Sequence, residues 1–277
     1  MPRKLKLTIA YDGTSFHGWQ AQRELRTVQG VLENALDSLT GTEVSIEGAS
    51  RTDRGVHALG QVASFETESP IPTERFAVVL NGRLPPDVRV TRADDVPLEF
   101  HARFSAVGKH YRYRLDRSDV PSVFNARYAL HVPGPLDLEA MRAAAEVLTG
   151  EHDFASFQCS SGDPRERTVR RLDAIQVEVM ENEWWIDVRG GSFLYKMVRT
   201  VAGTLLEVAR GRWDASRVAR ALEARDRREA GPTAPGHGLC LVEVYHEPLV
   251  LRRALGYVSL EDAPRLDGPS TGPAASA

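Results

Sequence analysis

The sequence is poor in cysteine and has no long apolar run. Its 277 residues include two cysteines, Cys159 and Cys240, far apart in the chain. This excludes a disulfide framework or a cysteine-rich zinc site, so both side chains are expected to pack as small apolar groups in a reducing compartment. The sequence contains no stretch of about eighteen apolar residues, the length needed to cross a membrane. The segment from Met1 to Lys4 has no signal-peptide character. We therefore expect a cytoplasmic protein with no membrane partner.

The chain also has little net charge, −3 at neutral pH, and few lysines. That balance argues at first against a nucleic-acid partner, but the distribution of charge matters more than its sum. Five basic residues and one acid lie between Arg103 and Arg117, and arginines recur from Arg165 to Arg171. Arginine suits phosphate and stacks on bases. The middle of the chain is therefore a candidate RNA surface, although a GC-rich genome also favours arginine over lysine throughout.

Nucleotide- and metal-binding motifs are absent as well. Neither Gly190-Gly191 nor the run from Gly231 to Gly238 forms a phosphate loop, because no lysine follows at the required spacing. We expect no cofactor and no metal.

Hydrophobic periodicity predicts alternating strands and helices. The first helix follows Thr27, a suitable N-cap, and ends at Gly41. Strands are expected near 4–9, 43–49, 59–66, 88–90, 111–115, 168–180, 183–189 and 239–245, with helices at 28–39, 73–82, 138–148, 193–210 and 214–226.

The order β-α-β-β-α-β thus occurs twice, with insertions in the second half. This predicts an α+β protein of two ferredoxin-like halves. They would share an extended antiparallel sheet, with helices on one face and a cleft between the halves. We expect an N-terminal half at 1–100, a C-terminal half at 101–248 and an extension at 249–277. The Gly-, Pro- and Ser-rich end of that extension, from about 264, is expected to be disordered.

The segment from Gly48 to Ala58, G-A-S-R-T-D-R-G-V-H-A, is the most informative part of the chain. It places Asp53 between Arg51 and Arg54, in a turn between two predicted strands. Nearby positive charge favours the ionised carboxylate, and a turn on a rigid scaffold leaves it open to a ligand. The pattern fits a catalytic carboxylate. It also fits an ordinary surface turn whose Asp caps its own backbone.

The string R-T-D-R-G-V-H-A resembles the signature of the bacterial tRNA pseudouridine synthase A family. Further matches follow in the family's order from about Lys4 to Glu247. One departure is Gly190-Gly191-Ser192, where many relatives carry a bulkier polar residue, so the start of the following helix is less well defined. The other matches are Y-D-G at 11–13, F-H-G-W-Q at 16–20, T-V-Q-G at 27–30, F-S-A at 104–106, K-H-Y-R-Y at 109–113, F-L at 193–194, M-V-R at 197–199 and Gly203.

The resemblance implies an enzyme that isomerises uridine to pseudouridine at positions 38, 39 and 40 in the anticodon stem-loop of tRNA. It implies a homodimer and a reaction without cofactor or metal. Asp53 takes the place of the family's catalytic Asp. Its task stays open among attack on the base, attack on the sugar carbon and removal of a sugar proton.

The resemblance also assigns two residues of the second half to the site. Arg199 lies in an apolar helical stretch and would pair with Asp53, since a buried cation is rarely unpaired; the alternative is an Arg that extends to solvent along its stem. Tyr111 would stack on the uracil, and its hydroxyl would help to move the proton from carbon 5. An ordinary strand tyrosine is the alternative, and Tyr113 would face the same way.

The remaining candidates are basic residues expected to contact RNA. Arg51 resembles the family residue that helps to extrude the target base, and His57 fits a structural role better than a catalytic one. Arg54 is expected to contact the RNA, and phosphate contacts are expected from Arg103, Lys109, Arg112 and Arg114, although only some residues of an alternating strand can face the cleft.

Two other classes of protein compete with this interpretation. Ferredoxin-like halves also form non-catalytic RNA-binding modules, but the aromatic strings of such modules are absent from the sequence. An Asp-dependent hydrolase of a small substrate would not need the basic strand at 109–117.

Overall fold

The fold is given by a computed structural model that describes residues 2–159 and 167–247. Both halves have the predicted order of elements. The N-terminal half consists of β1 (Arg3–Tyr11), α1 (Val28–Thr40), β2 (Glu47–Gly48), β3 (His57–Thr67), α2 (Thr73–Asn81) and β4 (Val88–Val96).

The C-terminal half adds two short strands that periodicity did not predict, β6 and β7. It consists of β5 (Gly108–Asp116), β6 (Leu130–His131), α3 (Leu138–Leu148), β7 (Gly150–Asp153), β8 (Val169–Met180), β9 (Glu183–Gly190), α4 (Met197–Ala209), α5 (Ala215–Ala224) and β10 (Leu239–Tyr245).

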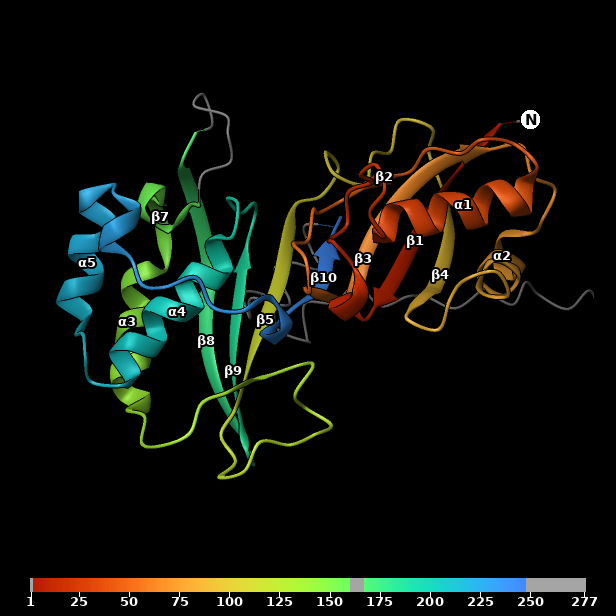
Figure 1. Ribbon diagram of the computed structural model, residues 1–277. Helices are drawn as coiled ribbons and strands as arrows, with labels where there is room; N and C mark the ends of the chain where they lie inside the picture. The colour runs from red at the N-terminus through yellow and green to blue at the C-terminus, as the bar shows by residue number, and fades with distance from the viewer. Residues whose placement is uncertain (1, 160–166, 248–277) are drawn as a thin grey trace, which may run out of the picture.

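One extended sheet runs through both halves (Figure 1). The strand order is β4-β1-β3-β10-β5-β9-β8-β7, with β2 also paired to β3 and β6 to β5. Within each half the order is therefore the same, β4-β1-β3-β2 in the first and β10-β5-β9-β8 in the second. All pairings are antiparallel except two, β3 with β10 and β5 with β6. The predicted α+β class with two ferredoxin-like halves is confirmed.

Strand β10 joins the halves. It pairs with β5 along most of its length, and its first residues pair with the start of β3, where Cys240 lies opposite His57 and Leu241 opposite Ala58. Strand β10 is thus inserted beside β3, the strand that follows the Asp53 turn. Helices α1 and α2 lie beside the strands of the first half, and α3, α4 and α5 lie beside those of the second half (Figure 1).

The predicted limits of α1 are confirmed. The Thr27 side chain accepts a hydrogen bond from the Gly30 N–H, and Gly41 ends the helix at φ 74°. The strand predicted at 43–49 is wrong in length, because only Glu47–Gly48 pairs with β3.

The cause lies in α1, whose acidic side chains bind the backbone of the residues between α1 and β2. Asp37 accepts the N–H of Val44 at 2.7 Å and Glu33 accepts that of Ile46 at 3.1 Å. Helix α4 also begins later than predicted, at Met197, because Lys196 has a φ of 59°, which an α-helix cannot contain.

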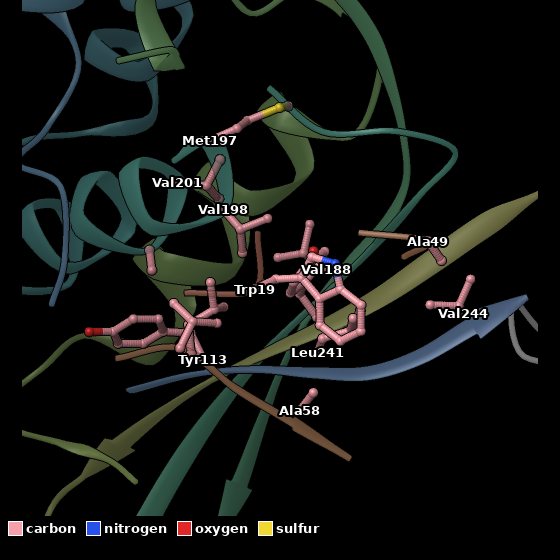
Figure 2. Close-up of a cluster of buried hydrophobic side chains, with 14 of the residues drawn as sticks. Trp19, Ala49, Ala58, Tyr113, Val188, Met197, Val198, Val201, Leu241 and Val244 are labelled. Atoms are coloured by element: carbon pink, nitrogen blue, oxygen red, sulfur yellow. The ribbon is translucent and has the colours of Figure 1, made fainter. Parts of the chain in front are cut away.

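The core is continuous between the halves. Figure 2 shows a buried cluster in which Trp19 and Ala58 of the first half lie among Tyr113, Leu241 and Val198 of the second. Packing across the boundary fixes the two halves against each other. The division at about residue 100 falls between β4 and β5 and stays a proposal. The extension predicted at 249–277, and Arg165 with Glu166, lie outside the described residues.

Within residues 2–159 and 167–247, no helix is long and apolar enough to span a bilayer.

Candidate active site

The Asp53 turn is held by the N-terminal segment of the chain. The Thr52 carbonyl accepts the Trp19 N–H at 3.0 Å, and the Thr52 hydroxyl bonds the hydroxyl of buried Tyr11 at 2.7 Å. Gly18, at φ 97°, approaches so closely that a Cβ would lie 2.6 Å from the Thr52 carbonyl oxygen. Asp53 therefore sits on a fixed backbone, which suits a residue that must be positioned precisely.

Asp53 forms an ion pair with Arg199. The Oδ2–Nη1 distance is 2.8 Å, and the two side chains are 16% and 15% exposed. The Arg199 Nε donates to the Ala234 carbonyl at 2.7 Å, so the guanidinium is held from two sides. The predicted pair is confirmed, and both residues line the surrounding cleft.

The approach of the 231–235 segment to α4 depends on Gly203. A Cβ at that position would lie 1.8 Å from the Pro232 carbonyl oxygen, so any side chain would push the segment away. The Ala234 N–H donates to the Arg199 carbonyl at 3.0 Å, which fixes the same contact along the backbone.

Arg51 and Arg54, which flank Asp53 in the sequence, are both exposed. Within residues 2–159 and 167–247, neither forms a hydrogen bond or ion pair with Asp53. The cation in contact with Asp53 is therefore Arg199 and not one of its two sequence neighbours. Both arginines line the surrounding cleft and remain available to a ligand.

Tyr111 of β5 also lines the cleft around Asp53. Its hydroxyl bonds Ser50 Oγ at 2.7 Å, and its ring packs edge-on against Phe193 with centroids 5.1 Å apart. Burial, and to a smaller degree the Asp53 charge, raises the pKa of Tyr111 to about 12. Tyr113 faces the same way but is fully buried, and its hydroxyl donates to the Pro235 carbonyl. Of the two tyrosines, only Tyr111 lines the cleft.

The cleft between the halves has a volume of about 1360 Å³. Its wall combines the Asp53 turn, the loop before β5, the start of β5 and the start of α4. Seven residues singled out in the sequence line it, namely Arg51, Asp53, Arg54, Arg103, Lys109, Tyr111 and Arg199. The predicted cleft is therefore confirmed.

Arg112 does not line this cleft. It alternates with Tyr111 on β5 and so points to the other face of the sheet. There its guanidinium binds both oxygens of Asp187, at 2.8 and 2.9 Å, and covers the ring of Trp185 at 3.9 Å. Asp187 is fully buried and also bonds His110 at 2.6 Å. The structure gives Arg112 a bond between strands in place of the expected contact at the cleft. Arg114 is likewise bound on the same face, to both oxygens of Glu183 on β9 at 2.8 and 2.6 Å, and does not line the cleft.

His57 lies in the core beneath the site. It is 5% exposed, its Nδ1 accepts the Gly13 N–H at 3.0 Å, and burial lowers its pKa. It does not line the cleft, in keeping with the structural role expected for it.

The sequence argument missed two residues that position Tyr111, Ser50 and Phe193. Phe193 lies inside a family-like motif and Ser50 directly before one, but a serine in a turn and a phenylalanine before a helix carry no spacing signal. Gln61 is fully buried and in turn holds the Ser50 backbone: its side-chain oxygen accepts the Ser50 N–H, and its Nε2 donates to the Ser50 carbonyl at 2.7 Å.

No group of three or more His, Cys, Asp or Glu that could hold a metal ion occurs in the described parts of the chain.

Comparison with known proteins identifies a matching family and relatives that share one name. The sequence matches the family described as tRNA pseudouridine synthase over residues 7–105 and 144–247. It is 46% identical over 244 residues to tRNA pseudouridine synthase A of Acetivibrio thermocellus, covering 88% of this chain and all of that one. The protein of the same name from Brevibacillus brevis is 45% identical over 244 residues, again with 88% and 100% coverage.

Among solved structures, an archaeal box H/ACA sRNP Nop10-Cbf5 complex aligns with 11% identity and a TM-score of 0.31, over 82% of this chain and 60% of that one. That score is too low to support a conclusion. The match to the family, and relatives that align over their full length, are sufficient: the chain belongs to the tRNA pseudouridine synthase family.

Proposed function

We propose that this protein isomerises uridine to pseudouridine at positions 38, 39 and 40 in the anticodon stem-loop of tRNA. One observation carries the proposal: the Asp53–Arg199 ion pair lies in a cleft of about 1360 Å³. That volume exceeds the roughly 300–1,000 Å³ typical of small-ligand pockets. It suits an everted nucleotide together with its neighbours, as required of an enzyme that acts on a base of structured RNA.

The reaction needs one well-placed carboxylate. The bond between base N1 and ribose C1′ breaks, the base turns, C5 bonds to C1′, and the C5 proton leaves while N1 gains one. Atoms balance without a further reactant. Asp53 would attack the base, attack C1′ or remove a sugar proton. Arg199 would orient the carboxylate in each case and stabilise its charge.

Tyr111 would bind the uracil with its ring. Because its pKa is raised to about 12, the hydroxyl stays protonated near neutral pH and is not a phenolate base. A proton from C5 could pass through this hydroxyl only if the Tyr111 proton moved on at the same time. Ser50, 2.7 Å away, is the neighbour able to accept it.

The basic residues on the cleft wall would hold the RNA. Extruding a base costs a few kcal/mol, and Arg51 beside the Asp53 turn would offset part of that by filling the gap or holding a phosphate. Arg54, Arg103 and Lys109 would contact phosphates, which position RNA without reading its sequence. Arg112 is not included, because Asp187 holds it on the other face.

Two further expectations accompany this function. The protein would act as a homodimer, with one tRNA touching both subunits, and it would work in the cytoplasm, where tRNA is found. Light scattering of the free protein and of its tRNA complex would test the first.

Release of tritium tests the function directly. A tRNA transcript labelled with tritium at uridine C5 should lose label on incubation with the protein, and a matched transcript with cytidine at 38, 39 and 40 should not. A binding module or a small-substrate hydrolase would release no tritium. Equal release from both transcripts would contradict the assigned positions.

A further inference from the structure

Phe104 is an exposed aromatic residue in the wall of the cleft. It lies in the segment between β4 and β5, and 75% of its surface is exposed. Isolated apolar residues on a surface are common and need no explanation. Three features of Phe104 call for one: it is held rigidly, cations lie beside it, and it faces the same cleft as Asp53.

His101 fixes the backbone on which Phe104 is presented. The His101 Nδ1 accepts the backbone N–H groups of Arg103 at 3.1 Å and Phe104 at 3.4 Å. Its Nε2 lies 3.1 Å from Glu47 Oε2 on β2, which also lines the cleft. The His101 ring also packs against the Phe104 ring, with centroids 4.3 Å apart.

The same turn is tied to the sheet. Ala102 is fully buried, and its N–H donates to the hydroxyl of Ser64 on β3 at 3.1 Å. The Ser105 N–H donates to the His101 carbonyl at 2.9 Å, which closes the turn. An aromatic ring that is ordered before a ligand arrives loses little conformational entropy on binding, so it is well suited to contact a flat partner.

The charges next to Phe104 indicate the kind of partner. The Arg103 guanidinium lies 5.6 Å from the centre of the Phe104 ring. Lys109 is half-buried, and burial together with the Arg103 charge lowers its pKa to about 8. No ion pair neutralises Arg103 or Lys109 within residues 2–159 and 167–247. An anion bound between the two cations would relieve their repulsion.

The position along β5 relates this patch to the target base. Lys109 and Tyr111 are two residues apart on one face of the strand, a spacing of about 7 Å that one nucleotide can span. A base at Tyr111 would thus bring its neighbouring phosphate to Lys109 and its neighbouring base towards Phe104.

We propose that Phe104 stacks on the base next to the target uridine, and that Arg103 and Lys109 hold the phosphate between the two nucleotides. The proposal rests on the RNA substrate proposed above and adds a binding position for a second nucleotide. Flat stacking on aromatic side chains is the usual way in which proteins hold unpaired bases.

Substitutions at Phe104 separate stacking from simple packing. Phe104→Ala and Phe104→Leu should raise KM for tritium release about 5- to 150-fold, the range expected for losing one stacked base. Phe104→Trp should keep a KM close to that of the wild type, because an indole also stacks. Since the side chain is mostly exposed, all three variants should unfold at the wild-type urea concentration. A wild-type KM for Phe104→Ala or Phe104→Leu would overturn the proposal.

Fluorescence gives a second readout that does not depend on turnover. The emission that Phe104→Trp adds to the wild-type signal should be quenched by an anticodon stem-loop RNA. It should be restored when the RNA is abasic on both sides of the target. Val120→Trp, at a site 77% exposed and outside the cleft, is the matched control and should not respond.

Absence of quenching, or equal quenching by the abasic RNA, would contradict the stacking. Wild-type protein that releases tritium while all Phe104 variants behave normally would refute this inference alone. Wild-type protein that releases none would refute the proposed function, while the fluorescence response still decides the stacking.

Discussion

The carboxylate of Asp53 and the guanidinium of Arg199 are 146 positions apart in the sequence and 2.8 Å apart in the structure. Each half of the protein supplies one of them. The segment that holds Arg199, through Ala234, leads into β10, and β10 pairs with β3 directly after the Asp53 turn. The strand that joins the halves therefore also brings the pair together.

Replacing Arg199 tests what the pair contributes. Arg199→Met should lower the rate of tritium release at least ~100-fold, because it removes the charge that orients Asp53. It should also lower the free energy of unfolding by roughly 2 kcal/mol, less than for a fully buried pair because both side chains keep some exposure. Arg199→Lys is the matched control. It keeps the charge but cannot reach Asp53 and Ala234 together, so its rate should be intermediate.

Chemical denaturation and single-turnover kinetics give both quantities. A wild-type rate for Arg199→Met would show that the pair is structural only.

Ser50 and Tyr111 should behave as a coupled pair. Ser50→Ala leaves the buried Tyr111 hydroxyl without its partner and should cost about 1–2 kcal/mol of stability. Tyr111→Phe should cost less in the Ser50→Ala background than in the wild type, because the double variant leaves no hydroxyl unsatisfied. A double-mutant cycle of urea unfolding measures the coupling. Strict additivity would mean that the 2.7 Å contact contributes nothing.

Lys109 should make RNA binding depend on pH. Its pKa in the free protein is about 8, and lysine is charged below its pKa, so a rise from pH 7 to pH 9 removes the charge that would hold phosphate. Affinity for an anticodon stem-loop should fall roughly tenfold over this range. Lys109→Arg keeps its charge and should show a much flatter profile. Identical profiles for the two proteins in a fluorescence-anisotropy titration would exclude Lys109 from the RNA contacts.

Asp187 should support the fold at the face opposite the cleft. It is fully buried between His110 and Arg112, and Asp187→Asn should cost roughly 3 kcal/mol or more at pH 7, because the Arg112 guanidinium loses its buried counter-charge. Hydrogen bonds from both partners outweigh burial and hold the Asp187 pKa below 3.8.

The stabilisation is therefore present above that value and lost as the pH falls through the lower folded-state pKa. Urea unfolding from pH 7 to pH 3 should show this loss in the wild type and little of it in Asp187→Asn. The exposed Asp119 offers a control, since it forms no ion pair within residues 2–159 and 167–247 and Asp119→Asn should follow the wild-type curve. A parallel fall in both variants would rule out a special role for Asp187.

Local signals in the sequence predicted much of the fold. Thr27 and Gly41 marked the ends of α1, and alternation of apolar residues located the long strands. Capping and alternation each depend only on residues a few positions apart in the sequence. The short β2 was misjudged because the side chains of Asp37 and Glu33 bind backbone that a strand partner would otherwise take. That competition depends on where α1 lies in space.

The candidate site was also only partly predictable from the sequence. The Asp53 turn and the cation of Arg199 could be identified from motifs. The Ala234 carbonyl that holds Arg199 could not, because a backbone acceptor has no signature in the side-chain sequence. The orientation of Arg112 was within reach, since it alternates with Tyr111 along β5 and both cannot face the cleft.

Single-turnover tritium release by Asp53→Asn tests the catalytic role of Asp53 most directly. This change keeps the size of the side chain and removes its charge. We predict that the variant binds tRNA with an affinity close to that of the wild type and releases no tritium from uridines 38, 39 and 40. Release at the wild-type rate, from a preparation verified to contain asparagine at this position, would contradict this role.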